Sequence, residues 1–181
     1  MVKRILGLDP GLSSATAAVF GYPDGSSFPA ILGVLDIPTT GDGTTKRINV
    51  QAFFDWLETM NPDVAYIEVA STMPSFPDQN GVRRGMGIAS AGRYLRAAGA
   101  LEATVELFGI DIVYVQPRTW KRAFELSGPD KGNSLDLIRG LFPHLADTMF
   151  KRQKDHNRAE SCLLAVYGAA RHDLINLRVA A

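Results

Sequence analysis

The stretch ILGLDPGLSSATAAVF, residues 5–20, holds two apolar runs joined by a short polar turn. The first run ends at Asp9 and is followed by Pro10 and Gly11, a pair that is typical of turns. The second run lies in SSATAAVFGYP, residues 13–23. Two short apolar runs on either side of a turn predict an antiparallel hairpin at the start of a sheet. The Asp9 carboxylate is then expected to emerge at a strand end with little protein covering it.

The remaining chain predicts a mixed sheet with helices packed on it. Apolar runs predict strands at 29–38, 63–70 and 109–117, and helical spacing predicts helices at 48–62, 88–108, 117–126, 133–143 and 155–172. Residues 39–47 and 71–87 are expected to be polar loops. The order β-β-β-α-β-α-β-α-α-α indicates an α/β fold with a five-stranded sheet and helices on both faces. Residues 1–181 are expected to form a single domain.

The composition is that of a soluble protein without a global charge. Hydrophobic residues make up 46% of the chain, and 19 Lys and Arg balance 19 Asp and Glu. A nucleic-acid partner would therefore need a local basic patch. The single cysteine, Cys162, excludes an intrachain disulfide. No apolar run reaches membrane-spanning length, and MVKRILGLDPG becomes acidic and glycine-rich too early for a secretory signal, so we expect a cytoplasmic protein without a membrane partner.

Two carboxylates follow or interrupt apolar strands. Asp9 ends the first strand, where it is either a turn-capping residue or a catalytic one. Glu68 lies within VAYIEVA, residues 64–70, where a purely structural role is hard to assign. A carboxylate in an apolar strand is costly to bury alone, and it persists when it is paired, hydrogen-bonded or bound to metal.

Further acids stand at the start of the last helix, in KRQKDHNRAES, residues 151–161. His156 and Glu160 are four residues apart and share a helix face, and Glu160 faces the apolar stripe of that helix. Asp155 can join the same site only from the N-cap position, so it is either a helix cap or a metal ligand, or both. His156 is either a solvated first-turn residue or part of the site.

Acids from these three segments form an all-oxygen ligand set. Hard oxygen ligands suit Mg²⁺ or Mn²⁺ rather than zinc. Two such ions roughly 3.5–4 Å apart can activate a water and stabilise the leaving 3′ oxygen of a phosphodiester. The residues alone therefore favour metal-dependent phosphodiester chemistry.

The segments ILGLDPGLSSATAAVF, AYIEVA and KDHNRAESCLLAVYGAA together resemble the RuvC-type Holliday junction resolvases, most closely the phage-encoded branch. The resemblance covers nearly the whole chain and implies a ribonuclease H-like fold, a homodimer, and nicking of branched DNA with two Mg²⁺ ions per site. By this match Asp9, Glu68 and Glu160 are catalytic metal ligands. The family usually ends on Asp, three or four residues after the preceding ligand. Here the final position is Glu160, with Asn157 three residues before it, His156 four and Asp155 five. The fourth ligand is therefore left open between Asp155, which we name first, and His156.

The resemblance also marks positions for DNA contacts. Lys121 and Lys131 match the family's lysines after the fourth strand, where Lys121 would stabilise charge near the scissile phosphate. The alternative interpretation is that Lys121 and Lys131 are ordinary surface residues without a role in DNA binding. Arg83 and Arg84 are expected to contact a DNA arm, and Phe76 either wedges against bases or anchors its loop.

Four basic side chains surround the last acids. We expect them to rim the site and draw phosphate toward it: Lys151, Arg152, Lys154 and Arg158. A solvated helix end is the other interpretation of this cluster.

The function that follows is a metal-dependent endonuclease acting on four-way or branched DNA in a bacterial cytoplasm. A phage or prophage origin is implied by the resemblance alone, and a bacterial host gene is the alternative. Another ribonuclease H-like nuclease, cutting RNA–DNA hybrids or processing RNA, is the enzymatic alternative. A DNA-binding module whose site has decayed is the non-enzymatic one. An actin-like nucleotide-binding protein ranks last, because the second phosphate-binding glycine turn has no clear counterpart.

Overall fold

The computed structural model of the chain describes residues 3–70, 76–77, 83–84, 87–126 and 132–176. For 76–77 and 83–84 it describes the backbone alone. Lys131 lies outside the described residues, and so do the side chains of Phe76, Arg83 and Arg84. Every helix among the described residues is too short or too polar to cross a bilayer.

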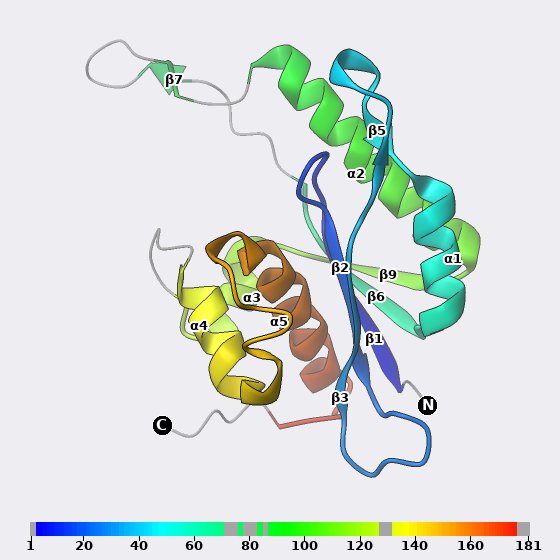
Figure 1. The fold of residues 1–181 in the computed structure, drawn as a ribbon, viewed down its shortest axis with the longest axis vertical. Coiled ribbons are helices and arrows are strands. Elements are labelled where there is room, and N and C mark those ends of the chain that lie inside the picture. Colours follow the sequence, from blue (N-terminus) through cyan, green and yellow to red (C-terminus); the bar gives the residue numbers. More distant parts are fainter. Residues whose placement is uncertain (1–2, 71–75, 78–82, 85–86, 127–131, 177–181) are drawn as a thin grey trace.

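A five-stranded sheet forms the middle layer of the molecule (Figure 1). Its strands are β1 (Arg4–Asp9), β2 (Thr16–Gly21), β3 (Ala30–Asp36), β6 (Val64–Glu68) and β9 (Asp111–Val115). Their order is β3-β2-β1-β6-β9, in which β1, β2 and β3 are antiparallel and β1, β6 and β9 are parallel. The mixed sheet with an N-terminal hairpin is therefore confirmed.

Helices cover both faces of this sheet, also as expected (Figure 1). They are α1 (Val50–Met60), α2 (Ile88–Phe108), α3 (Pro117–Ala123), α4 (Gly132–Leu141) and α5 (His156–Arg171), with short 3₁₀ turns η1 (Gly43–Thr45), η2 (Pro143–Leu145) and η3 (Gln153–Asp155). One apolar core lies beneath α1 and α2, and a second lies beneath α3, α4 and α5. Alternate residues of the central strands enter opposite cores, which is why these strands are apolar on both faces.

The polar segment 39–47 is more ordered than a loop. Its ends form a short antiparallel ladder of β4 (Thr39–Thr40) and β5 (Arg47–Ile48) around η1. Gly41 has a positive φ of 74°, a conformation that suits glycine, and Ile48 is buried in the core. A similar backbone ladder joins β7 (Phe76–Pro77) to β8 (Arg83–Arg84) within the second expected loop. Sequence alone missed both ladders because each strand has only two residues.

Helix α5 packs directly against β1 at a glycine. A Cβ added to Gly7 would lie 2.1 Å from the Ser161 carbonyl oxygen and 2.5 Å from the Ala165 nitrogen. The Thr16 hydroxyl also donates a 2.8 Å hydrogen bond to the Asn157 carbonyl at the start of α5. These contacts bring the first turns of α5 to the end of β1 that carries Asp9.

Candidate functional site

Asp9 and Glu68 lie at the same edge of the sheet. Strands β1 and β6 are parallel, and Leu8 is paired with Ile67. Each carboxylate belongs to the residue that follows this pair, and each is the last residue of its strand. Both side chains are partly buried. The carboxyl ends of two neighbouring parallel strands therefore present two acids side by side.

Glu160 reaches this edge from α5. Its side chain is only 15% exposed, and Oε1 accepts a 2.8 Å ion-paired hydrogen bond from Lys121 Nζ. The Ser134 hydroxyl, at the start of α4, lies 3.4 Å from the same oxygen. Three elements beyond the sheet thus hold this carboxylate in place.

Consecutive residues of α3 bind two of the three carboxylates. The Trp120 indole Nε1 donates a 2.7 Å hydrogen bond to Glu68 Oε2, and Lys121 bonds Glu160. Trp120 is fully buried, and Lys121 Nζ lies 5.1 Å from the centre of its ring. Helix α3 begins directly after β9, so the strand next to Glu68 delivers both side chains.

Electrostatic coupling links these groups. Burial raises the pKa of the Glu68 carboxyl, the Trp120 hydrogen bond opposes that rise, and the charge of Glu160 adds to it, while Lys121 lowers it. Burial likewise raises the pKa of the Tyr94 phenol, and the charges of Asp9 and Glu68 raise it further. Glu68 is therefore coupled to Glu160, and Asp9 and Glu68 both act on the Tyr94 phenol.

The carboxylates are not arranged as a finished ligand set. Among the described residues, no three His, Cys, Asp or Glu side chains are gathered closely enough to hold one metal ion. The cation beside Glu160 is the Lys121 ammonium, and one Glu68 oxygen is bound to Trp120. The chemistry of the donors fits Mg²⁺ or Mn²⁺, because all are carboxylate oxygens and the charge of Glu160 opposes ionisation of Glu68.

Asp155 and His156 each have a local partner. The buried Asp155 carboxylate accepts hydrogen bonds of 2.7 Å from the backbone N–H and from the guanidinium Nη2 of Arg152. These bonds hold the pKa of Asp155 below its ordinary value. Asp155 occupies the N-cap position of α5, but its side chain makes no capping bond to that helix. Of the two roles left open for it, the cap of α5 is therefore not observed, and the carboxylate instead closes the preceding turn η3. His156 Nδ1 lies 3.1 Å from the Gln153 carbonyl oxygen.

The basic rim is partly neutralised within the chain. Arg158 makes a bidentate ion pair with Asp36 at the end of β3, with Nε 2.7 Å from Oδ1. Arg152 forms an ion pair with Asp155. Lys151 and Lys154 are exposed to solvent. Arg158 therefore fastens α5 to the sheet, a contact that neighbouring sequence does not reveal.

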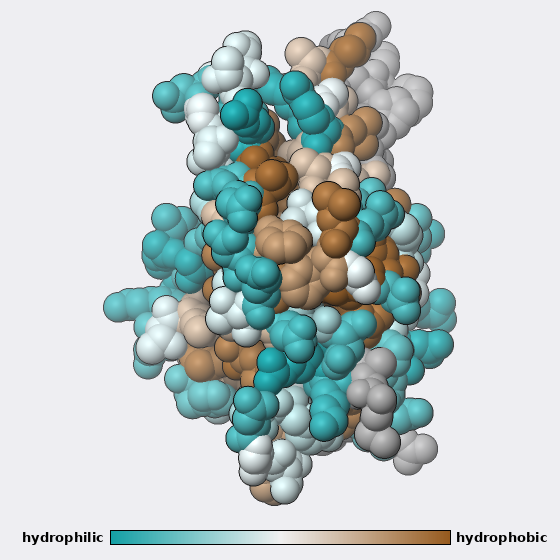
Figure 2. Space-filling model, turned by 90° about the vertical axis from the view of Figure 1, so that its right-hand side faces the viewer, coloured by the Kyte–Doolittle hydropathy of each residue, from teal (hydrophilic) through white to brown (hydrophobic). Residues whose placement is uncertain are grey.

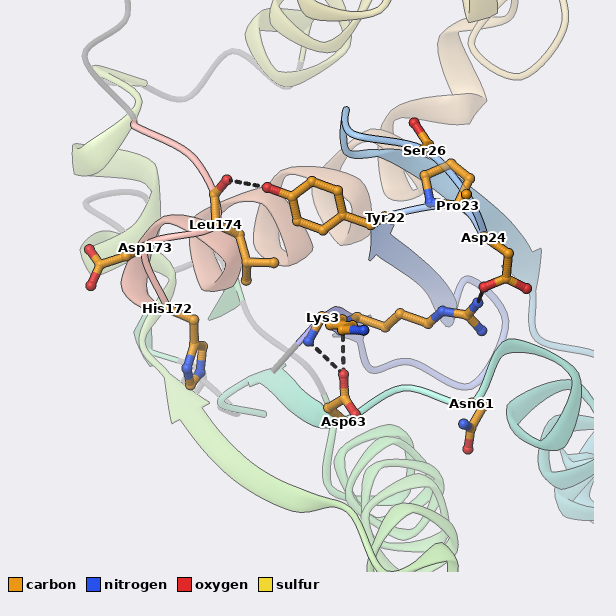
Figure 3. A pocket seen from close by; sticks show the side chains of 12 residues that line it. Lys3, Tyr22, Pro23, Asp24, Ser26, Asn61, Asp63, His172, Asp173 and Leu174 are labelled. Carbon is orange, nitrogen blue, oxygen red and sulfur yellow. Dashed lines mark hydrogen bonds and ion pairs between the residues drawn. The ribbon is translucent and has the colours of Figure 1, made fainter. Parts of the chain in front are cut away.

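A separate cavity of about 770 Å³ lies at the opposite end of the sheet (Figure 3). In its wall, the Asp63 carboxylate accepts hydrogen bonds from the backbone N–H groups of Lys3 and Arg4. The Asp24 carboxylate accepts one from the Arg4 guanidinium. Tyr22 donates a 3.2 Å hydrogen bond to the Leu174 carbonyl. None of the sequence-predicted site residues whose side chains the structure describes lines this cavity.

Trp120 and Ser134 were not anticipated as site residues. A buried indole N–H generally needs an acceptor, so a Trp directly before the candidate Lys121 was the available signal for Trp120. Ser134 carried no comparable signal, because its contact with Glu160 depends on how α4 packs against α5.

Comparisons with known proteins agree on the fold. No family model matches the chain, and no curated protein matches its sequence. Among solved structures, RuvC from Thermus thermophilus aligns with a TM-score of 0.60 at 15% identity, covering 94% of this chain and 96% of that one. The fowlpox virus Holliday junction resolvase aligns with a TM-score of 0.55 at 14% identity, covering 95% and 99%. The yeast mitochondrial Holliday junction resolvase aligns with a TM-score of 0.55 at 14% identity, covering 92% of this chain and 78% of that one.

The molecule thus has an α/β fold of the ribonuclease H-like class. Within that class it has the fold of the RuvC-like Holliday junction resolvases, and the similarity spans nearly all of the chain.

Proposed function

We propose that this protein is a metal-dependent endonuclease that nicks branched DNA and resolves four-way junctions. The observation that carries the proposal is the approach of Asp9, Glu68 and Glu160 to one edge of the sheet from three distant segments. The fold shared with the resolvases of Thermus thermophilus, fowlpox virus and yeast mitochondria supports the same function. One of the matching structures is Thermus thermophilus RuvC in complex with a Holliday junction substrate, with a TM-score of 0.61 at 14% identity.

In this proposal Asp9, Glu68 and Glu160 hold two Mg²⁺ or Mn²⁺ ions. When bound, such ions supply an activated water and stabilise the leaving 3′ oxygen. Trp120 orients Glu68 through its indole N–H, and Ser134 orients Glu160. Lys121 neutralises Glu160 in the free protein and is close enough to the site to contact the phosphate of a bound strand. Asp155, although bound by Arg152, is the first candidate for the remaining ligand, and His156 is the alternative.

The proposed enzyme works as a homodimer, because two symmetric nicks require two sites related by a two-fold axis. Exposed apolar side chains on α2 and the edge strand β9 supply a surface for that contact: Leu95, Leu107, Val113 and Tyr114. Tyr114 and Glu102 of α2 approach each other to 3.5 Å, so the two elements form one surface. Figure 2 shows apolar side chains gathered in the middle of one face of the molecule.

A substrate panel tests this function. Purified protein with Mg²⁺ is expected to cut a four-way junction at paired, symmetric positions, and much faster than a linear duplex of the same sequence. Chelation by EDTA is expected to stop cleavage. Equal cutting of junction and duplex would contradict junction selectivity, and preference for an RNA–DNA hybrid would favour the other nuclease class. Tight junction binding without cleavage would identify a decayed, non-catalytic module.

Replacing Trp120 with Phe is expected to raise the Mg²⁺ concentration needed for half-maximal cleavage by about 10–100-fold. The substitution keeps an aromatic ring but removes the N–H that holds Glu68 Oε2. Without that bond the carboxylate loses its orientation, and its pKa rises further. Titrating the cleavage rate with Mg²⁺ measures the effect. Phe124→Leu is the control. Phe124 packs against the Trp120 ring, but the hydrogen bond to Glu68 comes from Trp120 alone and is kept in this variant. An equal shift in both variants would assign Trp120 to packing alone.

A further inference from the structure

A polar groove of about 460 Å³ lies beside the candidate site. The turn between β1 and β2, the β4–β5 hairpin and the first turns of α2 form its walls. Its lining is Gly11, Leu12, Ser13, Ser14, Gly43, Lys46, Ser90, Arg93 and Tyr94. This set contains two cations, three hydroxyl side chains from serines and no acid. Such a lining presents donors and positive charge without an opposing carboxylate.

Among the described residues, the two cations of the groove have no carboxylate partner. Lys46 Nζ donates to the Ser13 hydroxyl at 3.2 Å, and Arg93 Nη2 donates to the Ser90 hydroxyl at 3.4 Å. Both side chains are only partly exposed. Within the part of the chain that the structure describes, neither lies within ion-pair distance of a carboxylate. Their charges differ in this respect from those of Arg152 and Arg158, which are paired with acids.

The groove lies close to two of the three carboxylates. Gly11 in its wall follows Asp9 by two residues, and Tyr94 in its opposite wall feels the charges of Asp9 and Glu68. A polymer with regularly spaced anionic groups can therefore extend from the carboxylate edge into the groove. Each cation would then face an anion, while the serine hydroxyls remain available as donors.

We propose that this groove binds the sugar-phosphate backbone of the DNA strand that continues from the nicked phosphodiester. Lys46 and Arg93 contact neighbouring phosphates of that strand, from opposite walls of the groove. The inference rests on the proposed function and extends it to residues of the β4–β5 hairpin and α2. Contacts to phosphate fix the register of the strand without selecting its sequence.

Salt dependence of junction binding tests the groove. Binding of a fluorescent four-way junction is measured in EDTA, where metal-dependent cleavage is absent, over a series of salt concentrations. For the Lys46→Gln/Arg93→Gln variant, the slope of log K against log salt is expected to fall by about 1 per lost phosphate contact, roughly 2 in all. Lys46→Arg/Arg93→Lys keeps both charges and is expected to keep most of the slope.

Two single variants serve as matched controls. Arg47 neighbours Lys46 and is exposed, but it does not line the groove, and Arg171 is exposed at the far end of α5. Arg47→Gln and Arg171→Gln are expected to leave the slope unchanged. An unchanged slope in the double Gln variant, or an equal fall in the controls, would overturn the groove assignment.

The two proposals fail in different ways. Junction cleavage by the parent protein in Mg²⁺, together with an unchanged salt slope in the Lys46→Gln/Arg93→Gln variant, would reject the groove and keep the nuclease. Groove-dependent binding without any cleavage would reject the nuclease and keep the groove as a DNA contact. Thermal unfolding of each variant verifies that the compared proteins are folded.

Discussion

The Glu160→Gln variant is expected to lose Mg²⁺-dependent junction cleavage by roughly a thousandfold, about 4 kcal/mol of transition-state stabilisation. The amide keeps the shape of the side chain but removes the charge that binds Lys121 and, in our proposal, the metal ions. Junction binding is expected to persist, because the variant removes a negative charge from a surface that receives phosphate. Single-turnover cleavage at saturating protein measures the rate separately from binding.

Glu58→Gln is the matched control for this prediction. Glu58 is exposed on α1, and its substitution is expected to leave the cleavage rate unchanged. Asp9→Asn and Glu68→Gln are expected to behave like Glu160→Gln. Cleavage at the parental rate in any of these three variants would remove that residue from the site.

Gly7→Ala is expected to destabilise the fold by about 3 kcal/mol or more, the upper part of the range for overpacked cores. The new methyl group would meet the Ser161 carbonyl and the Ala165 backbone nitrogen, and neither is the flexible end of a side chain. Relief requires α5 to move away from β1, which would also displace Glu160 from Asp9. Urea unfolding followed by circular dichroism measures the loss.

Gly99→Ala provides the opposite expectation with the same chemical change. Gly99 lies within α2, and an added Cβ would meet open space. Alanine is therefore expected to stabilise the protein by up to about 1 kcal/mol through helix propensity. Equal stability of Gly7→Ala and the parent would show that α5 does not approach β1 as closely as described.

The fold could be predicted because its signals are local. Apolar runs, turn residues and helical spacing identified all five strands of the main sheet and the helices that cover it. Asp9 and Glu68 could be singled out because a carboxylate in an apolar strand requires a reason. Their placement side by side then follows from parallel pairing of β1 and β6.

The partners of the site residues could not be predicted in the same way. Arg158 was assigned to DNA, yet its ion-pair partner Asp36 lies 122 positions away. Asp155 was expected to cap α5 or to bind metal. The sequence does not show that its carboxylate is instead hydrogen-bonded by Arg152, three residues earlier. The groove of Lys46 and Arg93 joins three separate segments. Such contacts depend on tertiary packing, which residue patterns encode only indirectly.

Equilibrium titration with Mn²⁺ tests the central claim most directly, because it detects ion binding without any DNA or cleavage. The parent protein is expected to bind two ions per chain, and Asp9→Asn, Glu68→Gln and Glu160→Gln are each expected to weaken or abolish that binding. Absence of Mn²⁺ binding by the parent, or binding that none of the three substitutions affects, would contradict a shared carboxylate metal site.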